Sequence, residues 1–298
     1  MIQGKVLLVY NPKAGNGLFR ISLDRIIGMF QGRNMVVVPI RADQSQLLDE
    51  VLRSAKAGEY KKVIAAGGDG TLNIVVNAML RTGTELPLAL FPEGTANEFA
   101  YNFGIPRTIK GMASVALEDY YSYVDMGKVN DRYFLNVVAI GDLLDISQKT
   151  DRKAKNALGL AAYYLKALTA IPGARPLPVY LDCEEYRGRE NMMGMVVLNG
   201  RSAGGFRNLM PEASCQDGYF DVILLRDLSP IDIPELLRDL LQGTYVDNPR
   251  VLYFRTKKIE ISSPYPLSCD MDGERGPELP LVIENLNRRL LVNVPGKH

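Results

Sequence analysis

The first 125 residues alternate short apolar runs with amphipathic stretches. Continuous apolar runs predict buried parallel strands at 5–10, 36–40, 63–66 and 88–91. Between the second and third runs, residues 44–57 have helical periodicity, and Asp43 and Gln46 have the spacing of a capping box at its start. The predicted apolar face of this helix consists of Leu47, Leu48, Val51, Leu52 and Ala55. Repeated strand–helix alternation indicates a doubly wound parallel sheet, an α/β domain.

The remaining chain has a different pattern, in which strand-like runs are separated by Gly, Pro, Asn and Asp. The runs lie at 133–140, 179–183, 192–198, 220–225, 259–262 and 290–294, with helical stretches at 157–171 and 231–241. Ser229-Pro230 suits the start of the second helix. This pattern predicts a mostly antiparallel β domain, sandwich-like, with inserted helices. We expect domains at 1–125 and 126–298, with the last residues packing back on the first domain and a cleft between the two.

Three glycine-rich loops follow predicted strands of this domain. The second glycine loop, Gly67-Gly68-Asp69-Gly70-Thr71, follows the third predicted strand. Glycines let a backbone approach phosphate and donate N–H groups, and Thr71 is expected to cap the following helix. The Asp69 carboxylate would bind Mg²⁺ associated with phosphates, or accept a hydrogen bond from a ribose or acceptor hydroxyl. The alternative is an Asp-Gly turn that only reverses the chain.

Two further glycine loops follow the first and fourth predicted strands. The first glycine loop spans residues 11–17, and a tight strand-to-helix turn explains it equally well. The third glycine loop spans residues 92–98, where Thr95 and Glu98 have the spacing of a structural capping box. Because ligands bind beyond the carboxyl ends of parallel strands, the three loops are expected to share one rim.

Composition limits the chemistry and the partners. The net charge of +1 gives no case for nucleic acid, and three scattered cysteines indicate neither a disulfide framework nor a zinc site, which favours a reducing cytoplasm. No run reaches the roughly 18 apolar residues of a membrane span. The single histidine is His298, so acid–base chemistry falls to a carboxylate, Lys, Tyr or Cys.

Taken together, the motifs resemble the soluble diacylglycerol kinase family of bacterial lipid kinases, which is related to sphingosine and ceramide kinases. The N-terminal motifs are 11-NPxAGxG-17, 67-GGDGTxN-73 and 94-GTANxFA-100. The C-terminal motifs are 136-NxxxIG-141, 204-GGF-206, 211-PxA-213, 217-DGxFD-221 and 272-DGE-274. The resemblance implies ATP-dependent phosphorylation of a lipid hydroxyl, with nucleotide on domain 1–125 and the lipid acceptor on domain 126–298.

The resemblance also implies residue roles. Nucleotide binding falls to Asn11, Pro12, Lys13, Ala14, Gly15, Gly67, Gly68, Asp69, Gly70, Thr71, Asn73, Gly94, Thr95 and Asn97. Asp217 would bind a structural Mg²⁺ with backbone oxygens of Ser214 and Tyr219, and Asp125 through water. Glu274 is the expected proton acceptor, with Asp272 in reserve and Asp69 orienting MgATP. Without the resemblance, a charged hairpin turn at Asp272-Gly273 is the simpler interpretation.

Several residues depart from the family pattern. Ile74 stands where glutamate is usual, and Glu93 adds negative charge beside the third loop. Arg41 stands near where many members of the family have a threonine that contacts nucleotide, and Glu98 for aspartate is a milder change. They motivate the alternative of a nucleotide- or lipid-binding regulator derived from a lipid kinase, while GGDGT alone also suits an NAD kinase. The expected partners are a lipid with a free hydroxyl and a transient membrane surface, and a homodimer is allowed. The apolar 157–171 helix, with Arg152, Lys153 and Lys155 upstream, would line the acceptor site or pack over the sheet.

Overall fold

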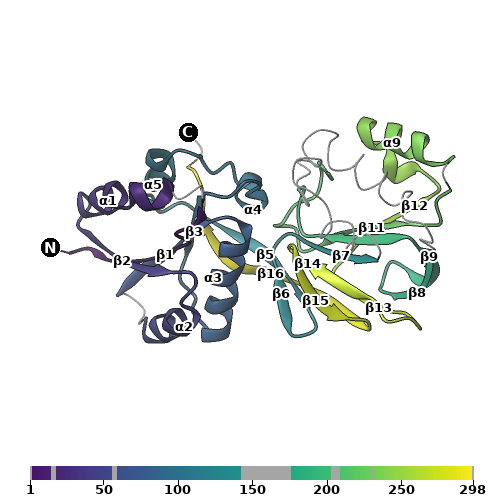
Figure 1. Ribbon diagram of the computed structural model, residues 1–298, viewed down its shortest axis with the longest axis horizontal. Coiled ribbons are helices and arrows are strands. Elements are labelled where there is room, and N and C mark those ends of the chain that lie inside the picture. The colour runs from purple at the N-terminus through teal and green to yellow at the C-terminus, as the bar shows by residue number, and fades with distance from the viewer. Residues whose placement is uncertain are drawn as a thin grey trace. The chain divides into compact units, whose positions relative to one another are not determined.

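The computed structural model describes residues 2–14, 18–55, 59–141, 176–202, 209–229 and 231–296. Contacts divide the chain into two compact units (Figure 1). Unit 1 comprises Met1–Val124 and Arg288–His298, and unit 2 comprises Asp125–Asn287. The expected helix at 157–171, its upstream basic residues, Gly15 and the 204–206 motif lie outside the described residues.

Unit 1 is built on a parallel sheet of short buried strands. Its order is β2 (Met35–Arg41), β1 (Gly4–Tyr10), β3 (Tyr60–Gly67) and β4 (Leu88–Pro92). The end of β16 (Leu281–Asn293) adds to β4 in parallel, with Val292 opposite Leu88. Val6 to Val9 and Val63 to Ala66 are buried, as expected of strands covered on both faces.

Helices cover both faces of this sheet. α1 (Leu18–Gln31) and α5 (Ile109–Leu117) lie together on one face, and α2 (Ser45–Ser54) and α3 (Asp69–Thr82) on the other (Figure 1). The prediction of a doubly wound α/β domain is therefore confirmed. The capping box predicted at Asp43 is wrong: α2 follows Gln44 with no side-chain cap, and the Asp43 carboxylate instead binds Arg41 at 2.6 and 3.1 Å.

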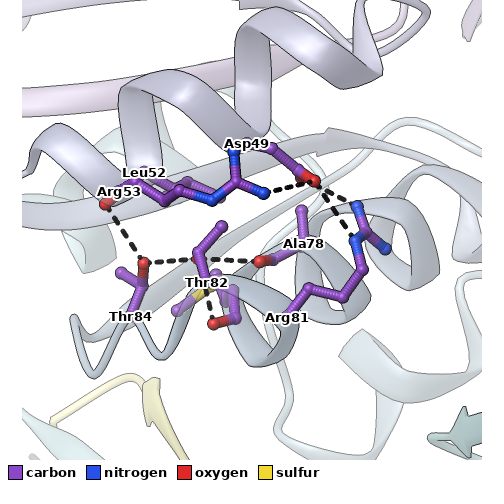
Figure 2. Close-up of polar contacts among 8 residues, drawn as sticks. Asp49, Leu52, Arg53, Ala78, Arg81, Thr82 and Thr84 are labelled. Atoms are coloured by element: carbon purple, nitrogen blue, oxygen red, sulfur yellow. Dashed lines mark hydrogen bonds and ion pairs between the residues drawn. The ribbon is translucent and has the colours of Figure 1, made fainter.

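Polar contacts join α2 to α3, as Figure 2 shows. The Asp49 carboxylate accepts from Arg81 at 2.7 and 3.2 Å and lies 3.6 Å from Arg53. Beyond the end of α3, Thr84 Oγ1 donates to the carbonyl of Leu52 at 3.4 Å. These contacts fix α3, the helix whose first residues belong to the second glycine loop.

Unit 2 is a β-sandwich, as predicted. One antiparallel sheet has the order β12 (Val251–Thr256), β11 (Phe220–Leu225), β10 (Gly194–Leu198), β7 (Val137–Gly141), β14 (Ser268–Met271), β15 (Glu274–Glu278). The other contains β13 (Lys258–Ser262) between β8 (Leu177–Asp182) and the start of β16, with β9 (Arg187–Met192) beyond β8. β5 (Tyr121–Val129) pairs with β6 (Arg132–Phe134) and with β16.

Two apolar clusters stabilise unit 2. The larger lies between the sheets and includes Phe134 and Phe220, whose rings stack at 5.6 Å. The smaller includes Leu236 of α9 (Ile233–Gln242) and Ile223 of β11, so α9 packs on the outer face of the six-stranded sheet. Among the described residues, no helix is both long and apolar enough to cross a membrane.

A buried lysine ties the end of β16 into unit 1. Lys62 Nζ donates to the carbonyl of Ala116 at 2.7 Å and to Asn293 Oδ1 at 2.9 Å, and it is 1% exposed. Asn293 Nδ2 donates to the carbonyls of Glu118 and Tyr120 at 3.1 and 2.8 Å. Burial lowers the pKa of Lys62, since the charged form loses hydration. Lys62 and Asn293 therefore hydrogen-bond to each other and to the main-chain carbonyls of Ala116, Glu118 and Tyr120.

Replacing Asn293 by leucine tests this anchor. Asn293→Leu keeps the number and branching of the side-chain heavy atoms but leaves Lys62 Nζ and two carbonyls short of partners, so we expect a loss of about 2–4 kcal/mol in the free energy of unfolding of unit 1. Denaturant titration measures it. The control is Arg289→Leu on the exposed part of the same strand, which should change stability by no more than about 0.5 kcal/mol. An equal effect of both variants would contradict the role of Asn293.

Candidate active site

The sheet of unit 1 brings the three glycine loops to one edge. In the register of the parallel strands, Tyr10 of β1 lies opposite Ala66 of β3, and Ala66 lies opposite Phe91 of β4. Each loop begins within one or two residues of this row. Because the strands run in the same direction, all three loops leave from the carboxyl edge of the sheet.

The second and third glycine loops touch through their backbones. A Cβ atom built on Gly94 would lie 2.5 Å from Cα of Gly68 and 2.8 Å from Oδ1 of Asn97. No side chain fits at Gly94, and a Cβ atom built on Gly68 would lie 3.2 Å from Cα of Gly94, which is a tight contact. The close approach of the loops therefore requires glycine at position 94. Asn97 holds the third loop: its Oδ1 accepts from Gly94 N at 2.8 Å, and its Nδ2 donates to Gly94 O at 2.6 Å.

Asp69 connects the same two loops electrostatically. It is the first residue of α3, and its carboxylate accepts from the backbone N–H of Phe99 at 3.5 Å, at the start of α4 (Glu98–Asn102). Burial raises the pKa of Asp69, and the backbone N–H groups of the third loop oppose that rise. A half-buried carboxylate thus sits between the two loops.

Two threonines expected to cap helices do not cap them. α3 follows Gly68, with no side-chain cap, so Thr71 is the third helical residue; it is buried with its side chain against Gly67. Ile74 then lies deeper in α3, 40% exposed, and no reciprocal capping bond is lost there. α4 follows Asn97 in the left-handed conformation (φ 52°), and Thr95 is exposed in the loop before it. In both places another residue precedes the helix: Gly68 before α3 and the left-handed Asn97 before α4.

The first glycine loop is described as far as Ala14. Asn11 N donates to the carbonyl of Ala66 at 3.0 Å, and Asn11 Oδ1 accepts from Lys13 N at 2.9 Å. Pro12 and Ala14 are half-buried, and Lys13 is exposed. The loop is thereby attached to the end of β3.

The remaining residues predicted in this region have separate surroundings. Asn73 Oδ1 accepts from Asn77 Nδ2 at 2.5 Å within α3, and Gly70 has open space around its missing side chain. Burial raises the pKa of Glu93, which carries the added negative charge beside the third loop. Arg41, paired with Asp43, is exposed at the end of β2.

In unit 2, Asp272 and Gly273 form a tight hairpin turn between β14 and β15. Both have positive φ (54° and 91°), and Met271 pairs with Glu274, as in a type I′ turn. The Asp272 carboxylate leaves the turn and accepts three backbone N–H groups, from Leu135 at 2.6 Å, Asn136 at 2.9 Å and Val137 at 3.0 Å. These bonds explain why the strand predicted at 133–140 is interrupted between β6 and β7.

The two neighbouring acids differ from Asp272. Asp270 is 8% exposed; it accepts from Gly273 N at 2.7 Å, and burial raises its pKa. Glu274 is exposed on the hairpin. Of the three acids within this motif, Glu274 is the one whose carboxylate is accessible to an acceptor molecule, while Asp270 and Asp272 hold the turn.

The loop at 214–219, which carries Asp217, is held by Asp125. Asp125 is fully buried; its Oδ2 accepts from Gly218 N at 2.6 Å, and its N donates to Cys215 O at 2.7 Å. Asp217 accepts from Tyr219 N at 3.0 Å and pairs with Arg255 at 2.5 Å. One carboxylate with the main-chain oxygens of Ser214 and Tyr219 is a hard-oxygen donor set that suits Mg²⁺, and Arg255 is a competitor for Asp217. No cluster of three acidic, Cys or His side chains suited to a metal occurs in the described ranges.

Sequence reasoning missed Asn199 and Arg255. Asn199 is 1% exposed directly after β10, and its Nδ2 donates to the carbonyls of Asp125 at 2.9 Å and Leu135 at 2.8 Å. The Asn199-Gly200 dipeptide after a strand could have drawn attention as a turn, but nothing local indicates its two distant acceptors.

Comparison with known proteins agrees with this arrangement. Residues 5–129 match the diacylglycerol kinase catalytic domain, and residues 137–294 match the YegS C-terminal NAD kinase beta sandwich-like domain. Two curated relatives named diacylglycerol kinase are 32% identical (Staphylococcus aureus, strain JH9) and 31% identical (Staphylococcus haemolyticus). Both alignments cover 97% of this chain, and 92% and 87% of the relatives. A Bacillus anthracis structure assigned as a diacylglycerol kinase has a TM-score of 0.81 and 26% identity, over 99% of this chain and 96% of its own.

An α/β unit with adjoining glycine loops followed by a β-sandwich unit is the domain order of a diacylglycerol kinase catalytic domain joined to a YegS-type C-terminal domain. The chain belongs to the diacylglycerol kinase-like family of bacterial lipid kinases. It is therefore an enzyme that transfers phosphate from a nucleotide substrate to a hydroxyl of a lipid. The relatives thus favour a lipid kinase over the alternatives of an NAD kinase or a non-catalytic regulator.

The contact between Gly68 and Gly94 can be tested by adding one methyl group. In Gly94→Ala the new Cβ would collide with Gly68 Cα and Asn97 Oδ1, so we expect the loops to separate, with a stability loss of about 1–3 kcal/mol and loss of nucleotide binding. Calorimetry with nucleotide and thermal unfolding measure both. The control is Gly28→Ala in the exposed part of α1, where a Cβ meets nothing within 4 Å and stability should rise by about 0.5–1 kcal/mol. Unchanged binding in Gly94→Ala would contradict the shared site.

Proposed function

We propose that this protein is an ATP-dependent kinase that phosphorylates the hydroxyl of a diacylglycerol-like lipid. The observation that carries the proposal is the backbone contact of Gly68 with Gly94, since a surface of closely spaced main-chain groups is what a polyphosphate requires. The relatives named diacylglycerol kinase support the choice of lipid.

In this proposal the nucleotide binds at the carboxyl edge of the sheet in unit 1. Amides of the second loop and of the start of α3 would donate to phosphate, where the helix dipole adds to their attraction. Asp69, between the two loops, would hold Mg²⁺ accompanying the phosphates or accept from a hydroxyl. Mg²⁺, when bound, would neutralise charge on the transferred phosphate.

Glu274 of unit 2 is proposed to accept the proton of the lipid hydroxyl. With no histidine except His298, a carboxylate is the natural base, and Glu274 is exposed while Asp272 already accepts three N–H groups. Proton removal leaves the alcohol oxygen free to attack the terminal phosphorus, and ADP leaves with the electron pair of the broken P–O bond.

The loop at 214–219 is proposed to hold a structural Mg²⁺ through Asp217 and the main-chain oxygens of Ser214 and Tyr219, with Asp125 linked through water. Supporting this is the oxygen donor set; opposing it is the ion pair of Asp217 with Arg255. The proposed partners include a membrane surface, which the protein contacts transiently because a diacyl lipid resides in a bilayer. A homodimer is also part of the proposal.

The test is transfer of label from γ-labelled ATP to lipids in mixed micelles. The panel contains diacylglycerol, phosphatidylglycerol, a polyprenyl alcohol and a sphingoid base, with NAD as a soluble acceptor. Label on diacylglycerol supports the proposal. Label on another lipid corrects the acceptor, and label only on NAD, or none on any acceptor, rejects it.

Removing the proposed base should slow chemistry and leave nucleotide binding intact. Glu274→Gln keeps the shape of the side chain but accepts no proton, so we expect kcat to fall about 10²–10⁴-fold with the Kd for nucleotide unchanged. The matched control is Glu278→Gln, an exposed glutamate on the same strand, with kcat within about twofold of the wild type. A kcat for Glu274→Gln close to that of the control would exclude Glu274 as the base.

Asp69→Asn should increase stability while it abolishes turnover. Because burial raises the pKa of Asp69 in the folded state, its stabilising contribution is present at low pH and is lost as the pH rises through the folded pKa. At pH 7 the ionised carboxylate therefore costs stability, and asparagine removes that cost while keeping an acceptor oxygen for Phe99 N. We therefore expect Asp69→Asn to raise the Tm at pH 7, by an amount that shrinks toward pH 4. A lower Tm at pH 7 would contradict this account of Asp69.

A further inference from the structure

The proposed proton acceptor, Glu274, lies on a hairpin that is held by hydrogen bonds to residues 135–137. Glu274 pairs with Met271 across the two-residue turn, and the turn is fixed by the Asp272 carboxylate on the N–H groups of Leu135, Asn136 and Val137. In return, Asp272 N donates to Val137 O at 3.0 Å. The segment 135–137 is thus hydrogen-bonded to the hairpin through both its N–H groups and the Val137 carbonyl.

Asn199 binds the carbonyl groups of the same segment, 135–137. Its Nδ2 donates to Leu135 O at 2.8 Å, and its backbone N donates to Asn136 O at 2.8 Å. The N–H groups of Leu135 and Asn136 therefore face Asp272, while their carbonyl groups face Asn199. An amide plane held at both edges has little freedom to rotate.

The same amide group of Asn199 reaches the support of the 214–219 loop. Its Nδ2 carries two protons; beside the bond to Leu135 O, it donates to Asp125 O at 2.9 Å. Asp125 holds Gly218 N and Cys215 O at 2.6 and 2.7 Å. One side chain, 1% exposed, hence joins two segments that lie 10 residues apart in sequence and that carry different parts of the proposed site.

We propose that Asn199 is a positioning residue that couples the 214–219 loop to the hairpin bearing Glu274. This inference rests on the proposed function for the role of Glu274, but the coupling itself is a property of the fold. A change in the loop that shifts the backbone of Asp125 moves the amide of Asn199, and with it Leu135 and the N–H groups that bind Asp272. The state of the Asp217 loop is thereby transmitted to the placement of the base.

The amide is the side chain that this junction requires. Both acceptors of the side-chain amide are carbonyls, so aspartate would present oxygen to oxygen, and alanine would remove this donor from both buried carbonyls. Serine supplies a single donor and can satisfy one carbonyl at a time. The expected order of coupling is therefore asparagine, serine, alanine.

Amide hydrogen exchange on the full-length chain is the primary test. In Asn199→Ala we expect exchange at residues 135–137 and 272–274, and also at 216–219, to accelerate at least about 10-fold. The matched control is Asn248→Ala, a buried asparagine of unit 2 whose Nδ2 binds Asp239 at 2.7 Å. It should accelerate exchange near 245–251 and leave both ends of the proposed coupling unchanged. If Asn199→Ala does not fold, Asn199→Ser is measured in its place, and it must accelerate exchange both at 216–219 and at 272–274.

Kinetics provide the second readout. Asn199→Ala should lower kcat about 10–100-fold with an unchanged KM for nucleotide, since misplacement of the base affects chemistry and not the loops of unit 1. Asn248→Ala, at matched loss of stability, should keep kcat within about twofold. Unchanged exchange at 272–274 in Asn199→Ala, or an equal response of the control, overturns the inference. If the wild type phosphorylates no lipid, the proposed function fails, and exchange alone still decides whether Asn199 couples the two segments.

Discussion

The structure of unit 1 depends on one close approach of backbones, that of Gly68 and Gly94. A single Cβ at Gly94 would lie 2.5 Å from Gly68 Cα, so the approach exists only because Gly94 has no side chain. The parallel register of β1, β3 and β4 delivers the loops to the same edge. Asn97 holds the third loop together, and Asp69 connects the third loop to the second. What results is a rigid surface of main-chain groups, which serves a phosphate-transferring enzyme because positioning and charge compensation are the larger part of that chemistry.

Several carboxylates of unit 2 organise the backbone, whereas the proposed base remains exposed. Asp125 binds Gly218 N, Asp272 binds three consecutive N–H groups, and Asp270 binds Gly273 N. Each replaces water with main-chain donors, which allows an acidic side chain to be buried. Glu274 remains exposed at the end of one such arrangement. Asp270 and Asp272 therefore hold the turn that precedes Glu274. Asn199 donates to the carbonyls of Leu135 and Asp125, beside the bonds made by Asp272 and Asp125.

Local sequence patterns predicted the elements well but failed at helix starts. The strands of unit 1 were found within a few residues, because four or five consecutive apolar residues between turns have one natural place in a parallel sheet. The expected caps at Asp43, Thr71 and Thr95 were wrong, since capping-box spacing says nothing of where the preceding backbone turns. The strand predicted at 133–140 was interrupted because Asp272, more than 130 residues later, takes up its N–H groups.

The sequence by itself determined the α/β and sandwich architecture, the three glycine loops and the shortage of histidine that leaves acid–base work to a carboxylate, Lys, Tyr or Cys, because these follow from periodicity, composition and backbone freedom. The tertiary structure alone decided which glycines touch, which acids are occupied by main-chain donors and that Asn199 joins two carbonyls 10 residues apart in sequence, from Asp125 and Leu135. The physical reason is that hydrogen-bond satisfaction in a protein interior is settled between segments distant along the chain, and no local pattern records the partner.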